Sequence, residues 1–227
     1  MNDRTVRTCR KVILVGGGSV QPSVLKEVLA QASHIVAADG GAKHVLDAGF
    51  TPHAVFGDMD SLSAADQERL PPEVLHHVAE QDSTDFDKCL RHIEATLVLG
   101  YGFLGQRLDH QLAAMNVLVR RAHQPCILVG RHDAVVHCPP ELRLTLPMGA
   151  RFSLFPMAPV RGRSAGLRWP IDGIDFAPAG VIGTSNEVCG PVSVAPEREG
   201  MVAIVPVESL DALVSAVQSA PRWPVRA

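Results

Sequence analysis

Two acidic clusters are the residues of this chain best suited to do chemistry. The first is Gly57-Asp58-Met59-Asp60-Ser61, and the second is Asp82-Ser83-Thr84-Asp85-Phe86-Asp87-Lys88. Like charges a few ångströms apart repel, so aspartates that gather in a fold need a cation to neutralise them. Magnesium prefers hard carboxylate oxygens and usually keeps coordination sites for phosphate oxygens. The two clusters therefore predict a divalent cation and phosphoryl chemistry.

The first cluster spaces two carboxylates so that they can share one cation. Asp58 and Asp60 are two residues apart, and residues at that spacing in an extended segment point to the same side. Gly57 permits a tight backbone path just before them. An Asp-rich turn without a ligand is the alternative, since aspartate and glycine are common turn residues.

The second cluster begins a helix. Thr84 is a suitable N-cap, with Asp87 at the third helical position, close to a capping box. Asp85 and Lys88 share one helix face, where Asp85 could complete a metal site and Lys88 could meet a phosphate oxygen. Free amides at a helix N-terminus also attract phosphate. The alternative is a capped surface helix in which these two side chains form an ordinary ion pair.

Three further motifs carry weaker signals. The glycine-punctuated segment 102–110 enters a helix; its Arg107 could hold phosphate oxygens bidentately, while Asp109 could simply be the N-cap. The run Gly16-Gly17-Gly18-Ser19 fits neither a Walker A loop nor G-x-G-x-x-G, so it indicates either a turn against a nucleotide or a bare strand-to-helix turn. Thr184-Ser185-Asn186 lies between apolar runs and by itself predicts a turn.

The first half of the chain alternates strand and helix signals. Strands are predicted at 11–15, 34–38, 54–56, about 96–100 and 126–130, and helices from about Pro22, over 42–48, after Thr84 and over about 109–122. This alternation predicts a mostly parallel sheet with helices on both faces. Ligands of such sheets bind beyond the carboxyl ends of the strands. Asp39, Asp58 and Asp60 all follow predicted strand ends, so the motifs and the topology agree.

Two of the predicted helices have a recognisable apolar face. In the helix after Thr84 the stripe consists of Phe86, Cys89, Leu90, Ile93 and Leu97. In the helix over 109–122 the residues expected to be buried are Leu112, Met115, Val119 and Ala122.

The second half of the chain has a different pattern. Prolines and glycines become frequent beyond about Val135, and short alternating runs appear at 142–146, 151–155, 166–171 and 201–207. Such runs predict an antiparallel β domain. We therefore expect an α/β domain over 1–135 and a β domain over 140–227, ending in a short helix at 209–220.

Composition narrows the functional class. The 227 residues are 46% apolar and 20% charged, which is typical of a globular protein. A formal net charge of -3 argues against nucleic acid or an anionic membrane as the main partner. There is no apolar run long enough to span a bilayer and no apolar signal-peptide core. The five cysteines are scattered, without a C-x-x-C pair, so a reducing cytoplasmic location is expected.

Taken in order, these motifs resemble those of the thiamine pyrophosphokinase (thiamine diphosphokinase) family. The matching segments are 38–42, 52–62, 81–90, Gly102–Gly105 with Arg107, Asp109 and His110, then 166–170 and 184–186. The resemblance spans roughly residues 11 to 207. No single motif is decisive, but together and in this order the motifs are specific.

The resemblance implies an N-terminal α/β nucleotide-binding domain with a mostly parallel sheet, a C-terminal antiparallel β-sandwich domain and a homodimer. Members of this family are enzymes that transfer the diphosphate of ATP to the hydroxyl of thiamine and release AMP. Their active sites lie between the α/β domain of one subunit and the β domain of the other. The implied cofactor is Mg2+.

The resemblance also implies roles for individual residues. Magnesium would be held by Asp58, Asp60 and Asp85, and phosphate charge would be balanced by Lys88 and Arg107. ATP would be bound by Asp39, Gly40, Gln81, Asp82, Asp109 and His110. Thiamine would be bound by Thr184, Ser185 and Asn186.

Two alternatives stay open at this point. Gln106 stands where the family commonly has glycine, and Gly183 where a serine is frequent. The alcohol could therefore be another hydroxymethyl heterocycle, such as a pterin. A non-catalytic module that senses nucleotide or thiamine is the second alternative, although so many charges around a metal exceed what binding alone requires.

Overall fold

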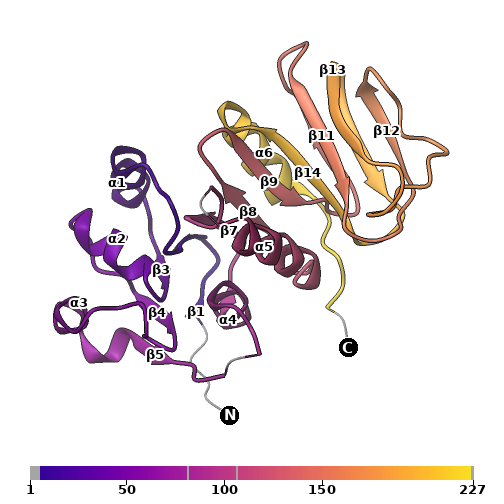
Figure 1. Cartoon of the computed structure of the whole chain (residues 1–227). Helices are drawn as coiled ribbons and strands as arrows, with labels where there is room; N and C mark the ends of the chain where they lie inside the picture. The colour runs from indigo at the N-terminus through magenta and orange to yellow at the C-terminus, as the bar shows by residue number, and fades with distance from the viewer. Residues whose placement is uncertain (1–5, 81, 106, 226–227) are drawn as a thin grey trace. The chain divides into compact units, whose positions relative to one another are not determined.

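The computed structural model describes residues 6–80, 82–105 and 107–225 (Figure 1). Contacts divide the chain into two compact units. The first comprises Met1–Val117 and Leu128–Arg131, and the second comprises Leu118–Ile127 and His132–Ala227. The sequence-based boundaries, 1–135 and 140–227, stay a prediction; the contacts assign 118–127 and 132–135 to the second unit.

A parallel sheet forms the first unit, as the alternating pattern predicted. Its strands are β2 (Lys11–Val15), β3 (Ile35–Ala38), β4 (Ala54–Gly57), β5 (Leu75–His77) and β7 (Leu97–Tyr101). They run in the order β7-β2-β3-β4-β5, and every neighbouring pair is parallel. Apart from Lys11, all residues of β2, β3, β4 and β7 are buried, which explains why these strands are almost continuously apolar.

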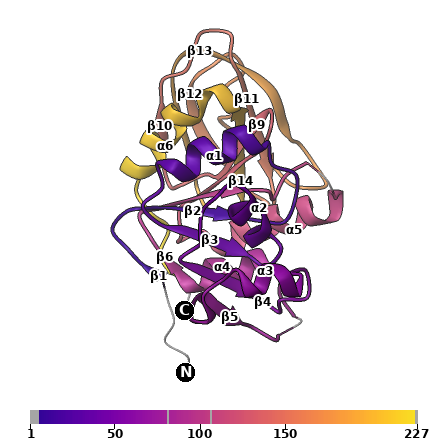
Figure 2. The same cartoon turned by 90° about the vertical axis from the view of Figure 1, so that its left-hand side faces the viewer.

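Helices connect these strands (Figures 1 and 2). They are α1 (Pro22–Ala30), α2 (Gly41–Asp47), α3 (Ala64–Glu68), the 3-10 helix η1 (Pro72–Val74), α4 (Asp85–His92) and α5 (Leu108–Arg120). Helix α2 packs against β2 and β3, while α4 packs against β3 and β4. A short parallel pair joins β1 (Val6–Arg7) to β6 (Ile93–Glu94), and β8 (Cys126–Val129) is divided between the two units. Within the described ranges, none of the helices combines the length and apolarity needed to cross a bilayer.

Antiparallel strands dominate the second unit. They are β9 (Asp133–His137), β10 (Leu142–Leu144), β11 (Arg151–Pro156), β12 (Gly162–Leu167), β13 (Gly183–Pro196) and β14 (Met201–Pro206). The long strand β13 changes partner along its length, since residues 183–187 pair with β11 and residues 188–196 pair with β12 and β10. The predicted antiparallel pattern is confirmed. So is the terminal helix, which forms α6 (Leu210–Ser219) after the 3-10 helix η2 (Val207–Ser209).

The predicted stripe after Thr84 is wrong in its last two members. Helix α4 ends at His92, and Ile93 has the extended dihedrals φ -109° and ψ 124°. Ile93 pairs with β1, and Leu97 lies in β7. A periodic apolar pattern cannot distinguish a longer helix from a helix followed at once by a buried strand.

The predicted buried face of α5 is also wrong. Leu112 is 58% exposed, whereas Ala114, Val117 and Leu118 are buried. The helix is apolar on more than one side, so spacing alone did not identify the face that packs.

The glycine run after β2 packs directly against the segment after β7. The Gly16 amide donates to the Tyr101 carbonyl at 2.7 Å, and the Gly18 amide donates to the Gly102 carbonyl at 2.9 Å. A Cβ at Gly18 would overlap the Gly102 carbonyl oxygen, whereas a Cβ at Gly17 would meet nothing closer than 3.5 Å. Close approach of two backbones is therefore one requirement for glycine in this turn.

Gly18→Ala should destabilise the protein by about 1–3 kcal/mol, because the added methyl group must push two backbone segments apart. Gly17→Ala is the matched control in the same turn and should change stability by no more than about 0.5 kcal/mol. Urea unfolding of both variants measures the difference. Equal destabilisation by the two substitutions would contradict the packing argument.

Candidate active site

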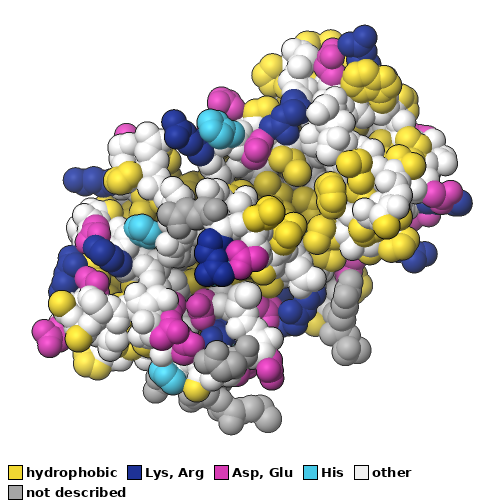
Figure 3. All heavy atoms as spheres, viewed as in Figure 1, with side chains coloured by type: hydrophobic (Ala, Val, Ile, Leu, Met, Phe, Trp, Pro, Cys, Tyr) yellow, Lys and Arg dark blue, Asp and Glu magenta, His cyan; other side chains and the backbone are white. Residues whose placement is uncertain are grey.

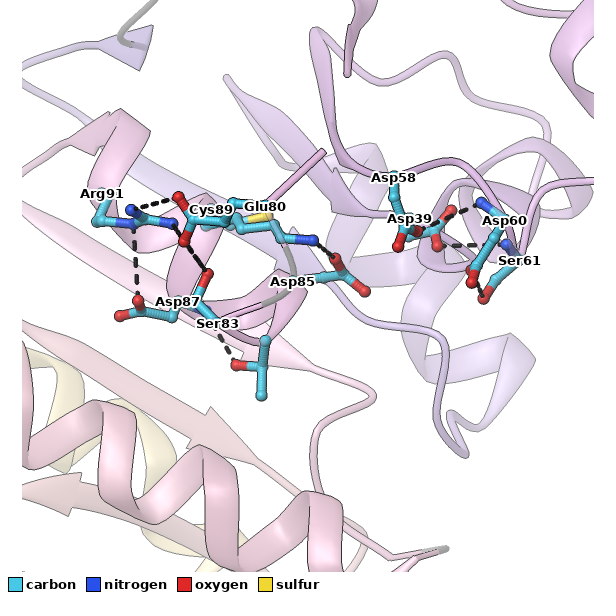
Figure 4. A network of polar contacts seen from close by, with 12 residues as sticks. Asp39, Asp58, Asp60, Ser61, Glu80, Ser83, Asp85, Asp87, Cys89 and Arg91 are labelled. Atoms are coloured by element: carbon cyan, nitrogen blue, oxygen red, sulfur yellow. Dashed lines mark hydrogen bonds and ion pairs between the residues drawn. The ribbon is translucent and has the colours of Figure 1, made fainter. Parts of the chain in front are cut away.

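Three carboxylates come together where β3 and β4 end. Asp39 directly follows β3, and Asp58 and Asp60 follow β4. These strands are parallel neighbours, with Ala38 paired to Phe56, so their carboxyl ends meet at one edge. One carboxylate oxygen from each aspartate lies within 4.8 Å of the others (Figure 4). The arrangement offers several hard oxygen ligands to one cation.

A turn, and not an extended segment, brings Asp58 and Asp60 together. Met59 between them has a left-handed φ of 63°, so the predicted extended geometry is wrong. The Asp60 amide donates to Asp58 Oδ1 at 3.4 Å, and the Ser61 hydroxyl donates to Asp60 Oδ1 at 3.0 Å. Local hydrogen bonds in this turn, and not the alternation of side chains along a strand, therefore bring the two carboxylates together.

Asp39 is the buried member of the group. Its side chain is almost inaccessible, with a relative exposure of 2% for the residue. The Ser61 amide donates to Oδ2 at 3.3 Å, while Oδ1 is buried without a hydrogen-bond partner. Burial raises the pKa of Asp39 to about 6; the Ser61 amide opposes this rise and the Asp85 charge adds to it. A buried acceptor without a donor is costly, and a cation would satisfy it.

Close backbone packing holds Asp39 in place. A Cβ at Gly57 would lie only 2.7 Å from the Asp39 Cβ, so glycine at this position makes room for the carboxylate side chain. Asp39 itself has a positive φ of 39°. Positive φ is unusual outside glycine and persists when the surroundings enforce it.

Lys88 supplies a buried positive charge at the start of α4. Its side chain is 3% exposed, and Nζ donates to Asp85 Oδ1 at 3.0 Å. Thr84 caps the helix, because its hydroxyl oxygen accepts from the Asp87 amide at 3.3 Å. The predicted cap and the shared face of Asp85 and Lys88 are confirmed. An ordinary surface ion pair does not describe a lysine buried to this degree.

Arg91 ties the loop before α4 to the helix. Its guanidinium donates to both Glu80 carboxylate oxygens, at 3.2 and 2.6 Å, and to the Ser83 hydroxyl at 2.9 Å (Figure 4). It also lies 3.6 Å from Asp87 Oδ2, which is buried. The hydrogen bonds from Arg91, with help from Ser83, lower the pKa of Glu80 to about 2. This network fixes the acidic segment that carries Asp85.

A pocket of about 600 Å³ surrounds these groups in the first unit. The predicted site residues that line it are Asp39, Gly40, Asp58, Asp60, Asp85, Lys88, Arg107 and His110. Asp82 and Asp109 are not among the lining residues. Gln81, predicted to bind ATP, and Gln106 lie outside the described residues. A volume of this size is typical of a small-molecule site.

Arg107 and Asp109 form an exposed pair at the entrance to α5. The guanidinium donates to Asp109 Oδ1 at 3.2 Å and to Oδ2 at 2.6 Å. This contact raises the pKa of Arg107 and lowers that of Asp109. Both side chains are about two-thirds exposed, at 66% and 64%, so the pair is free to open toward an anion.

Sequence reasoning missed Lys43, His44 and Gln111, which also line the pocket. His44 Nε2 lies 3.1 Å from the Gly18 carbonyl oxygen and so connects α2 to the glycine turn. Lys43 and His44 lie in the first turn of α2, and their position after a strand-to-helix turn was the available signal. Gln111 lies one turn into α5 and had no such signal.

The triplet Thr184-Ser185-Asn186 lies in the second unit, away from these carboxylates along the chain. It belongs to β13 and not to a simple turn, although Ser185 has a left-handed φ of 61°. Pairing with β11 shifts register here, which is the signature of a β-bulge. The three residues line a separate pocket of about 310 Å³, together with Trp169.

Comparison with known proteins connects these features to one family. Residues 25–129 match the family model "Thiamin pyrophosphokinase, catalytic domain". Thiamine pyrophosphokinase 1 of Oryza sativa subsp. japonica is 29% identical over 187 residues, covering 67% of this chain and 71% of that protein. Among solved structures, thiamin pyrophosphokinase from Candida albicans has a TM-score of 0.74 at 13% identity, covering 91% of this chain and 94% of its own. The enzyme from Bacillus subtilis has a TM-score of 0.70 at 20% identity, with coverage of 87% and 98%.

Without a bound cation, Asp39 should make stability depend on pH. Its folded pKa of about 6 lies above the unfolded value of about 3.9. The stability that protonated Asp39 allows is therefore fully present below about pH 4, and it is lost as pH rises through about 6 and the buried side chain ionises. Asp39→Asn should therefore stabilise the chelator-treated protein near neutral pH, and its advantage over wild type should shrink as pH falls. Thermal unfolding across this range measures the effect, with Asp211→Asn as the control. Parallel pH profiles for Asp39→Asn and wild type would contradict the assignment.

Proposed function

We propose that this chain, which belongs to the thiamine pyrophosphokinase family, transfers the diphosphate of ATP to the hydroxyl group of thiamine and releases AMP. The observation that carries the proposal is the pocket in which three carboxylates gather near a buried lysine. Such a pocket suits a phosphate ester bound with a metal ion. Its position beyond the carboxyl ends of β3 and β4 is the usual ligand position in α/β sheets.

Magnesium fits the residues present. Asp58 and Asp60 would hold the ion, and Asp39, whose Oδ1 is buried without a hydrogen-bond partner, belongs to the same group of carboxylates. When bound, the ion would supply positive charge that stabilises the negative charge of the transferred phosphates. We keep Asp85 as a further candidate ligand, although its Oδ1 accepts from Lys88.

Lys88 and Arg107 would then both neutralise negative charge on the phosphates. Lys88 is held rigidly by Asp85 and by the packing of α4, so it would present a fixed charge at little reorganisation cost. Arg107 and its partner Asp109 are both exposed, so Arg107 could leave Asp109 and take phosphate oxygens bidentately. His110 also lines this pocket.

For the alcohol, we propose the pocket at Thr184-Ser185-Asn186 in the second unit. The family resemblance suggests a homodimer in which the α/β unit of one copy meets the β unit of the other, and a β-sandwich arrangement for that unit. The partner change along β13 is consistent with two packed layers. A cytoplasmic location is proposed because the five cysteines are scattered, without a C-x-x-C pair.

Purified protein with ATP, magnesium and thiamine should release AMP in step with thiamine diphosphate. A hydroxymethyl pterin offered in place of thiamine is the substrate control. Release of ADP in place of AMP, or preference for the pterin, would overturn the proposal. ATP binding without any turnover would instead indicate a sensing module.

Asp60→Asn should lower kcat/KM by about a hundredfold or more, because it removes a charge placed to hold the cation. The fold should survive, since Asp60 is exposed and accepts a hydrogen bond from the hydroxyl of Ser61, its neighbour in the chain. Asp211→Asn, an exposed aspartate in α6, should retain wild-type turnover. Unchanged turnover in Asp60→Asn would remove this residue from the metal site.

A further inference from the structure

The carboxamide of Asn186 holds both backbone polar groups of Trp169. The Trp169 amide donates to Asn186 Oδ1 at 3.1 Å, and Asn186 Nδ2 donates to the Trp169 carbonyl at 2.7 Å. The Glu187 amide also donates to Oδ1, at 2.9 Å. Two donors at the oxygen and one acceptor at the nitrogen determine the orientation of this amide. Its side chain is therefore engaged with the protein backbone.

This contact extends a strand pairing that the backbone alone cannot continue. Along β12 and β13, the last backbone bond toward Trp169 joins the Arg168 amide to the Glu187 carbonyl at 2.8 Å. Residues 183–187 of β13 pair with β11 instead. The Asn186 carboxamide has the same donor and acceptor as a peptide group. It therefore makes the two hydrogen bonds with the Trp169 backbone that a neighbouring strand would otherwise make.

Trp169, the residue that Asn186 holds, lines the pocket in the second unit. Trp169 is 54% exposed, whereas Asn186 is only 6% exposed. Trp169 lines the pocket together with Ile171, Phe176 and Ile182. Hydrophobic side chains gather on the surface over the β11–β14 region (Figure 3). The exposed indole is thus available to a ligand, and the buried amide is not.

Two neighbouring contacts restrict the same wall. The Arg168 guanidinium lies over the Trp169 ring, 5.1 Å from its centre, and is itself bonded to the Glu187 carboxylate at 3.1 Å. Ser185, which lines the same pocket with a left-handed φ of 61°, is held because its amide donates to the buried Ser153 hydroxyl at 3.0 Å. Trp169 and Ser185 are therefore both fixed before a ligand arrives.

We propose that Asn186 is a positioning residue that acts through Trp169: it fixes the indole against which the alcohol substrate binds. This inference rests on the proposed function for the identity of the substrate. It replaces the expectation that Asn186 itself contacts thiamine. Because the amide is buried and bonded at both ends, substrate affinity depends on it indirectly.

A double-mutant cycle separates positioning from direct contact. Asn186→Ala and Trp169→Ala should each raise the KM for thiamine by roughly tenfold, an effect on the scale of one lost hydrogen-bonded contact. The double variant should be no worse than Trp169→Ala alone, and the KM for ATP should stay within about twofold of wild type. Additive effects of the two substitutions would show that Asn186 contacts the substrate itself and would overturn the proposal.

Asn186→Asp guards against a folding failure. It keeps the acceptor for the two amides but turns a carboxylate oxygen toward the Trp169 carbonyl, so it should loosen Trp169 while leaving the strand in place. Cys189→Ser, at an exposed position of β13, is the control for substitution in this strand and should behave as wild type.

Fluorescence provides a readout that does not need turnover. In a Trp223→Phe background, Trp169 is the one remaining tryptophan. Asn186→Asp should lower its fluorescence anisotropy and raise its quenching by acrylamide, measured at a temperature below the unfolding transition of both proteins. Unchanged anisotropy and quenching would overturn the positioning role. If the wild type forms no thiamine diphosphate, the proposed function is refuted. The fluorescence measurement still tests whether Asn186 positions Trp169.

Discussion

Repulsion among the carboxylates at the ends of β3 and β4 is the constraint on which the rest of the first unit depends. One of them, Asp39, is buried, and burial raises its pKa to about 6 because the ionised form is unfavourable there. The neighbouring backbone is arranged to keep it in place. Gly57 leaves room for its side chain, Ser61 donates to it, and the left-handed turn at Met59 returns the chain toward it. Concentrating negative charge in this way is unfavourable unless a cation or a proton offsets it.

The aspartates that look alike in sequence have separate structural tasks. Asp58 and Asp60 face the cluster, while Asp85 pairs with a buried lysine. Asp87 is buried beside Arg91, which also clamps the loop before α4 through Glu80. The anchoring contacts matter to the chemistry, because the charge on α4 is only as well placed as the loop that leads into the helix.

Local patterns predicted most of the fold, and tertiary packing decided what they missed. The parallel sheet, the antiparallel second unit and the terminal helix follow from apolar periodicity and turn residues. The end of α4 at His92 and the packed face of α5 depend on neighbouring elements, so periodicity misplaced them. In the site, Asp58 and Asp60 were recognisable from spacing. Asp39 was placed near them because it also follows a predicted strand end, and the structure brings the three carboxylates together. The hydrogen bonds of Asn186 join segments far apart in the chain, and no local signal encodes them.

Both pockets contain residues with strained backbone conformations. Among the residues that the structure describes, the non-glycine residues with positive φ are Asp39, Met59 and Ser185, and each lies in or beside a pocket-lining segment. Such conformations cost on the order of 1–3 kcal/mol each and persist only where the surroundings enforce them. In both units a specific donor or acceptor does so: the Ser61 amide holds Asp39, and the Ser153 hydroxyl holds Ser185. The strain is therefore set during folding, which leaves less ordering to be done when a ligand binds.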